Sequence, residues 1–135
     1  MRKSLFCVPL VGLCSVVCLL MTGCGGGGNP LPPPAAVTGL GYNRTSDDPA
    51  LVQLSWTPGS RRATKGYLVA RKFQGESAFT RLTTVPITTP AYTDRVPDEK
   101  ALVTAFYEVV AVDKKDRTGT PAEIQAVVSP PAPPF

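Results

Sequence analysis

The stretch Val52-Gln53-Leu54-Ser55-Trp56 decides how this chain folds, because its apolar side chains occupy every second position. Successive side chains of a β-strand point to opposite faces, so Val52, Leu54 and Trp56 would lie together on a buried face. The same period of two recurs in three later segments, 67–69, 107–111 and 124–128. Alternation of this kind predicts half-buried strands rather than helices.

Clusters of turn-forming residues separate these segments at close spacing. The clusters are rich in Gly, Pro, Asp, Ser and Thr, which tight turns favour. They lie at 45–49, 58–60, 74–77, 88–90, 97–98 and 114–121. Short strands joined by regular turns, with no window of helical period, predict an all-β sandwich.

Five segments, in their order and spacing, resemble strands of a fibronectin type III domain. They are 37–40, 52–56, 66–69, 91–94 and 107–113. The resemblance implies a seven-stranded immunoglobulin-like sandwich over residues 35–129, with sheets A-B-E and C-C′-F-G. It also implies that the BC, C′E and FG turns and the start of strand A share one pole, while the AB, CC′ and EF turns share the other.

The resemblance further implies which side chains face the core. These are Val52, Leu54, Trp56, Tyr67, Val69, Tyr92, Tyr107, Val109 and Ala111. One departure concerns the tyrosine that the family carries two positions before Tyr107, whose hydroxyl bonds the turn between strands E and F. Ala105 stands there in this chain, so the tyrosine corner is missing and we expect that end to be less stable unless Leu102 or Phe106 compensates.

The start of the chain has the pattern of a secretory signal, expected over residues 1–23. Arg2 and Lys3 precede an apolar run at 5–21, and small residues lie before Cys24. The run is shorter than the ~20 apolar residues that a membrane-spanning helix needs. An ordinary cleaved signal and an uncleaved membrane helix stay open as alternatives.

The residues around the expected cut, Leu20-Met21-Thr22-Gly23-Cys24, resemble the lipobox of bacterial lipoproteins, with Met21 where that family prefers Leu. The resemblance implies that the thiol of Cys24 receives a diacylglycerol and that the new N-terminus is acylated. Each buried CH₂ contributes about 0.8 kcal/mol, so two or three chains would hold the protein on a membrane. The implied location is the bacterial cell envelope, and Gly25 after the anchor points to the outer membrane.

The remaining cysteines, Cys7, Cys14 and Cys18, lie in the signal, so the exported protein has no thiol left for a disulfide. Residues 24–34 combine the lipidated cysteine with a Gly- and Pro-rich linker, and a Pro-rich tail at 130–135 closes the chain. The fold must therefore rest on the core of a single domain.

Composition argues against an enzyme. The chain has no histidine, which removes the commonest general base and metal ligand, and it has no spare cysteine as a nucleophile. No glycine-rich loop leads from a strand into a helix, as phosphate binding requires. We expect no catalytic residue, no cofactor and no small-molecule substrate.

Acidic pairs at 47–48 and 98–99 could converge at one pole and offer oxygen ligands to Ca²⁺. No spacing typical of a calcium loop supports this, and a solvated acidic pole is the preferred interpretation. Basic residues accompany the pairs there, namely Arg44, Arg95 and Lys100. We therefore expect no metal site.

Charge also argues against nucleic acid as a partner. Removing Arg2 and Lys3 with the signal lowers the formal net charge from +4 to +2. Proteins that neutralise several phosphates carry a larger and more clustered positive charge.

Two surfaces remain as candidates for binding. The predicted partner face contains outward positions of strands C and F, namely Leu68, Ala70, Phe106, Val110 and Val112. Contiguous apolar surface often marks a partner site, although scattered apolar residues are also normal on strands. An envelope protein is the expected kind of partner.

The second surface, the predicted basic pole, lies at the BC and FG turns and would face the membrane that Cys24 enters. It contains Arg61, Arg62, Lys65, Lys114, Lys115 and Arg117. The alternative is that these residues serve solubility only.

Together these observations predict a lipid-anchored cell-envelope protein that presents one fibronectin type III-like domain for binding or spacing. The alternative is an accessory subunit that tethers a carbohydrate-active enzyme or a secretion machine to the envelope, with the domain as a passive spacer. A small hydrolase is a remote third interpretation.

Overall fold

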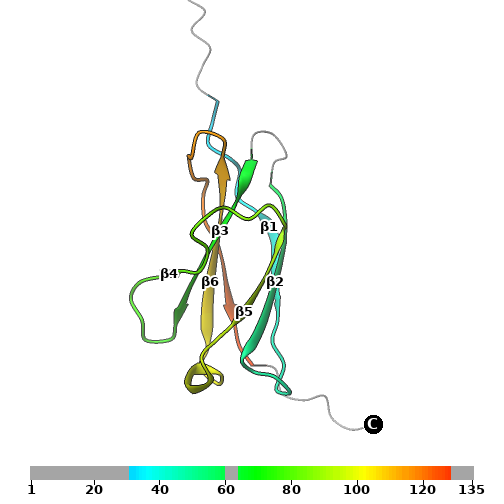
Figure 1. Cartoon of the computed structure of the whole chain (residues 1–135), viewed down its shortest axis with the longest axis vertical. Helices are drawn as coiled ribbons and strands as arrows, with labels where there is room; N and C mark the ends of the chain where they lie inside the picture. The colour runs from blue at the N-terminus through cyan, green and yellow to red at the C-terminus, as the bar shows by residue number, and fades with distance from the viewer. Residues whose placement is uncertain (1–30, 60–63, 129–135) are drawn as a thin grey trace, which may run out of the picture. The chain divides into compact units, whose positions relative to one another are not determined.

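The computed structural model describes residues 31–59 and 64–128. The signal, Cys24, Arg61, Arg62 and the tail lie outside these residues. The described part contains seven strands and one 3₁₀ turn (Figure 1). They are β1 (Thr38–Asn43), β2 (Leu51–Thr57), β3 (Thr64–Phe73), β4 (Thr80–Arg81), β5 (Ala91–Arg95), η1 (Asp98–Lys100), β6 (Ala105–Asp113) and β7 (Ala122–Ala126). No helix among the described residues is long and apolar enough to cross a membrane.

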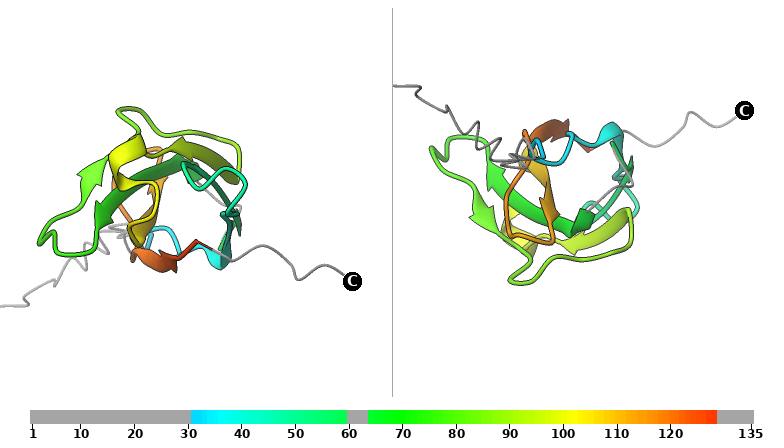
Figure 2. Two further views of the ribbon diagram at one scale, coloured as in Figure 1. Left: turned by 90° about the horizontal axis from the view of Figure 1, so that it is seen from below. Right: turned by 90° about the horizontal axis from the view of Figure 1, so that it is seen from above.

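The strands form two antiparallel sheets, with the orders β1-β2-β5 and β4-β3-β6-β7. These orders correspond to strands A-B-E and C′-C-F-G, which confirms the predicted sandwich. The register aligns Leu54 with Tyr92 across β2 and β5, and Val69 with Val109 across β3 and β6. Figure 2, which looks along the strands, shows β7 beside β1, so the two sheets approach each other on that side.

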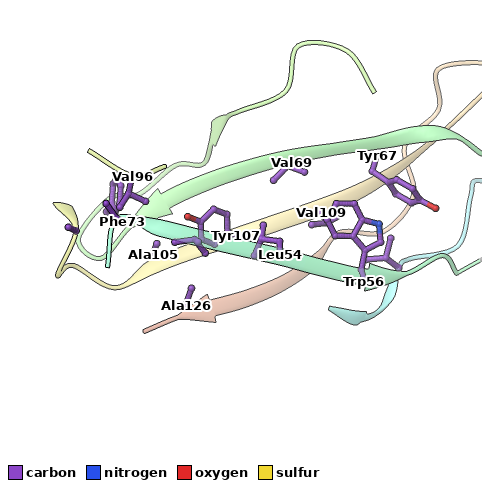
Figure 3. Packing of buried hydrophobic residues seen from close by; sticks show 14 of the residues in the cluster. Leu54, Trp56, Tyr67, Val69, Phe73, Val96, Ala105, Tyr107, Val109 and Ala126 are labelled. Atoms are coloured by element: carbon purple, nitrogen blue, oxygen red, sulfur yellow. The ribbon is translucent and has the colours of Figure 1, made fainter. Parts of the chain in front are cut away.

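The alternating residues of β2, β3 and β6 meet between the sheets and form the core. The rings of Trp56 and Tyr67 make an edge-on contact with their centroids 5.3 Å apart (Figure 3). Burying a large apolar side chain contributes about 1.5 to 3 kcal/mol, most of which offsets the entropy lost on folding. Tyr92 is the exception among the predicted core residues, because it is half-buried at the edge of the cluster.

The two ends of the sandwich are formed by different segments of the chain (Figure 1). The entry pole consists of residues 31–36, 58–59 and 114–121. The distal pole consists of residues 44–50 and 97–104 together with the end of β7. The described chain therefore begins at one pole and ends at the other.

Candidate functional site

Asp113 and Arg117 organise the turn at the entry pole. Arg117 Nη2 lies 2.7 Å from the buried Asp113 carboxylate, and the backbone N–H groups of Lys115 and Arg117 donate to its other oxygen at 2.8 and 2.9 Å. Burial alone would raise the pKa of Asp113, but the hydrogen bonds from Arg117 and Lys115 together lower it. The turn is therefore built around an ionised carboxylate.

The same guanidinium also holds the segment that leads into the domain. Arg117 Nη1 donates to the carbonyl oxygen of Leu31 at 2.6 Å, and Nη2 donates to that of Pro32 at 3.4 Å. Gly119 lets this segment approach closely, since a Cβ there would lie 2.2 Å from the Pro34 carbonyl oxygen. Arg117 is thus a half-buried structural residue of the predicted basic pole and not a free surface cation.

Ion pairing neutralises one further residue of the predicted basic pole, Lys65. Lys65 Nζ lies 2.6 Å from Asp116 Oδ1, with both side chains largely exposed. Lys114 and Lys115 are exposed and form no ion pair with any residue that the structure describes. Among the described residues of this surface they are the two cations that remain available to a partner, while Arg61 and Arg62 lie outside the described residues.

The predicted partner face lies on the outer side of β3 and β6, as expected, but it is less exposed than its sequence indicates. Leu68, Ala70 and Phe106 are half-buried. Val110 and Val112 are buried, with only 9% and 3% of their surface exposed, so the expectation that these two are exposed is wrong.

The turn 114–121 accounts for this difference, because it folds back along β6. Thr118 pairs with Val112, and the N–H of Gly119 donates to the carbonyl oxygen of Ala111 at 2.9 Å. Phe106 is covered in another way, by the ammonium of Lys72, which lies 5.6 Å from its ring centroid and 4.5 Å from that of Phe79.

An open groove of about 330 Å³ remains on this face. Its apolar lining comes from Leu68, Ala70 and Val110, three residues of the predicted partner face. Further lining comes from Val69, Arg81, Glu108, Thr118, Gly119 and Pro121. This volume is at the small end of ligand sites, and the open shape suits side chains of another protein better than an enclosed small molecule.

Arg44, at the distal pole, is the main structural residue that sequence reasoning missed. Only 1% of its surface is exposed, so its expected place in a solvated acidic pole is wrong. Its guanidinium donates to five carbonyl oxygens, those of Pro49, Lys100, Ala101, Val103 and Ala126, at 2.6 to 3.4 Å. Burial lowers the pKa of Arg44, yet an arginine stays protonated in proteins.

These bonds join the turn after β1, the connection between β5 and β6, and the end of β7. The missing tyrosine corner would have bonded that same connection, so Arg44 supplies the link that Ala105 cannot. Nothing in the residues around Arg44 distinguishes it from a solvated arginine, since all five of its partners are backbone groups.

A second buried polar group joins the two sheets. The hydroxyl of Tyr107 on β6 donates to Asp94 Oδ2 on β5 at 2.6 Å, and Arg71 Nη1 on β3 lies 2.6 Å from the same oxygen. Burial, together with the hydrogen bond to Asp94, raises the pKa of Tyr107 well above its ordinary value of 10.0. The group is enclosed between the sheets and acts as a structural tie.

The acidic pairs of the distal pole are not assembled as a cation site. Asp48 accepts a hydrogen bond from Arg95 Nη1 at 3.3 Å. Within 31–59 and 64–128, no three acidic, cysteine or histidine side chains come close enough together to share a metal ion.

Comparison with known proteins identifies the fold. No protein-family model and no curated protein matches the sequence. Among solved structures, a Fn3-like protein from Clostridium thermocellum is 22% identical, with a TM-score of 0.51 over 77% of this chain and 100% of that chain. The FN1-FN3 domains of chicken CNTN1 are 16% identical, with a TM-score of 0.56 over 71% of this chain and 32% of that one.

Domains d3-d4 of the rat CD45 extracellular region give a similar result, at 16% identity and a TM-score of 0.53 over 70% of this chain and 49% of that chain. Identities this low establish a shared fold and nothing more. The chain therefore has a fibronectin type III-like fold.

Proposed function

We propose that this chain is a lipid-anchored protein of the bacterial cell envelope, in the outer membrane, whose domain binds a protein partner without catalysis. The observation that supports binding is the open groove on the outer face of β3 and β6. Three predicted partner-face residues, Leu68, Ala70 and Val110, line it. A face that served only as a solvated surface would not need this apolar lining.

The proposed anchor fits the way in which the chain enters the domain. The segment from Cys24 to Leu31 spans at most ~25 Å when fully extended, so the domain would stay close to the membrane. Leu31 is bonded to Arg117 at the entry pole, and the linker therefore joins the domain at that end. We propose that this pole faces the membrane, with Lys114 and Lys115 attracted to anionic head groups.

Substitution within the groove tests the binding proposal. Ala70→Arg would place a long charged side chain in the groove, and we expect it to abolish capture of the partner from detergent-solubilised envelopes. Gln53→Arg is the matched control, because Gln53 is exposed on β2 in the opposite sheet. Equal capture by the wild type and the Ala70→Arg variant would contradict a role for the groove.

A passive spacer is the second candidate, and one observation favours it. The described chain enters at one pole and ends at the other, as a unit placed in series between two attachments must (Figure 1). As a spacer, the domain would tether a carbohydrate-active enzyme or a secretion machine through its C-terminal side. Partner capture that survives Ala70→Arg but is lost on deletion of residues 129–135 would favour this function over groove binding.

A further inference from the structure

One row of residues crosses the whole outer face of the four-stranded sheet. The register aligns Arg81 on β4 with Ala70 on β3, Ala70 with Glu108 on β6, and Glu108 with Glu123 on β7. Arg81, Ala70 and Glu108 all line the groove, so the row faces outward. Adjacent strands lie about 4.8 Å apart, which puts the basic and acidic ends of the row roughly 14 Å from each other.

The charges of this row are not neutralised within the part of the chain that the structure describes. None of its ion pairs includes Arg81, Glu108 or Glu123. Glu108 and Glu123 lie directly opposite each other on neighbouring strands, an arrangement of like charges that destabilises a sheet. A cation supplied from outside would relieve this repulsion.

We propose that this face binds the same face of a second copy of the chain, around a two-fold axis that runs parallel to the strands between β3 and β6. That rotation exchanges the β4 and β7 flanks, so Arg81 meets the partner's Glu123 and Glu123 meets the partner's Arg81. The apolar groove lining lies between the two contacts. The inference deepens the proposed function, because it names the partner of the same groove.

The charges select this axis over the other that a face-to-face pair could use. A two-fold axis running across the strands would leave each flank facing itself, with Arg81 against the partner's Arg81 and the glutamates against glutamates. Like charges held together across an interface disfavour the pair. The favoured axis also keeps both entry poles at one end, so the two proposed lipid anchors would enter the same membrane.

The size of the face indicates a weak interaction. The strands β4, β3, β6 and β7 contain 2, 10, 9 and 5 residues. At about 3.3 Å per residue and about 4.8 Å between strands they cover on the order of 400 Å², whereas a standard interface buries about 800 Å² per partner. Pairing in dilute solution would therefore be slight. Confinement of both copies to one membrane raises their effective concentration and favours the pair.

Charge reversal in the full chain tests the proposal within the membrane. Donor and acceptor fluorophores are fused after Phe135 in two co-expressed copies, and energy transfer is measured in membranes against an unrelated lipid-anchored acceptor of equal density. Wild-type transfer should exceed this reference. Arg81→Glu in both copies, or Glu123→Arg in both copies, should lower transfer to the reference level. Arg95→Glu is the control for an equal change of charge at an exposed site of the opposite sheet, and it should leave transfer unchanged.

Mixing the two reversals gives the decisive measurement. A donor copy with Arg81→Glu and an acceptor copy with Glu123→Arg have opposite charges at both contacts, so transfer should return to the wild-type level. Transfer that persists in either single reversal, or that stays at the reference in the mixed pair, would overturn the proposal. Sedimentation of the purified Cys24→Ser chain at high concentration, with the same variants, separates a failure of pairing from a failure of anchoring.

Discussion

Arg44 donates a 2.6 Å hydrogen bond to the carbonyl oxygen of Ala101, a residue of the connection between β5 and β6 at the distal pole. Its other Nη atom bonds both Val103 and Ala126. One buried guanidinium therefore donates to backbone carbonyl groups from three separate segments, and of its five acceptors Lys100 also accepts from the N–H of Val103. Buried carbonyl groups that lose a charged donor are costly, so this residue should contribute strongly to stability.

Arg44→Met should lower the free energy of unfolding by about 3 to 5 kcal/mol, because several carbonyl oxygens would lose their donor. Arg44→Lys should recover only part of this loss, since one ammonium cannot reproduce the planar fork of a guanidinium. Urea denaturation of the three proteins measures the effect. An unchanged midpoint for Arg44→Met would show that water replaces the guanidinium at little cost.

Trp56→Ala should cost about 3 to 5 kcal/mol, a large part of the 5 to 15 kcal/mol typical of a domain. The indole is buried against Tyr67, and no disulfide is expected to compensate. Trp56→Phe should cost less, because it keeps a buried aromatic ring at this position. It also removes Nε1, which has no hydrogen-bond partner among the described residues. Thermal melting compares the two variants, and equal losses would show that ring volume does not govern the effect.

Acid should weaken the Asp113 turn. The pKa of this carboxyl is lower in the folded protein than its ordinary value of 3.8, so its contribution to stability is present above that value and is lost as the pH falls through the folded pKa. Asp113→Asn should therefore destabilise the protein at pH 7 and make its stability less dependent on pH in the acid range. Melting curves of both proteins across this range provide the test, and parallel curves would contradict the assignment.

Cys24→Ser should abolish incorporation of labelled fatty acid and release the protein from the membrane fraction, because two or three acyl chains would no longer hold it. Cys18→Ser is the control, since Cys18 lies within the expected signal. Labelling that persists in the Cys24→Ser variant would contradict the lipid anchor.

Lys114→Ser combined with Lys115→Ser should weaken binding of the chain lacking residues 1–24 to anionic vesicles at low salt. Each lysine near such a surface contributes about 1 kcal/mol, so the affinity should fall by roughly 30-fold. Lys65→Ser should have a smaller effect, because Lys65 is already paired with Asp116. Binding should be lost at about 0.5 M salt, because salt screens the attraction between the lysines and the anionic lipid. Equal binding to neutral vesicles would contradict a role of these lysines in membrane binding.

The strands could be predicted from the sequence because alternation reports directly on burial. Trp56 and Val109 lie in the core because their side chains point between the sheets, whereas the side chains next to them in sequence point to the outer face. The order of strands in the sheets came from the family resemblance, since a period of two does not reveal which strands pair. Arg44 could not be recognised, because a buried arginine bonded to backbone carbonyls leaves no pattern in its own neighbourhood.

The partner face was harder to predict for a related reason. Whether Val110 and Val112 are exposed depends on the path of a turn, and the return of Thr118 along β6 is set by Asp113 and Gly119. The charged row became visible only with the register, which aligned residues from four separate segments of the chain.

The bonds from Arg117 to Leu31 and Pro32 also decide how the domain would withstand mechanical force. A pull on the linker reaches these carbonyls before it reaches β1, and Arg117 passes the load to Asp113 at the end of β6. Because β6 lies between β3 and β7, tension would be shared with an interior strand of the larger sheet and would not peel β1 away from its edge.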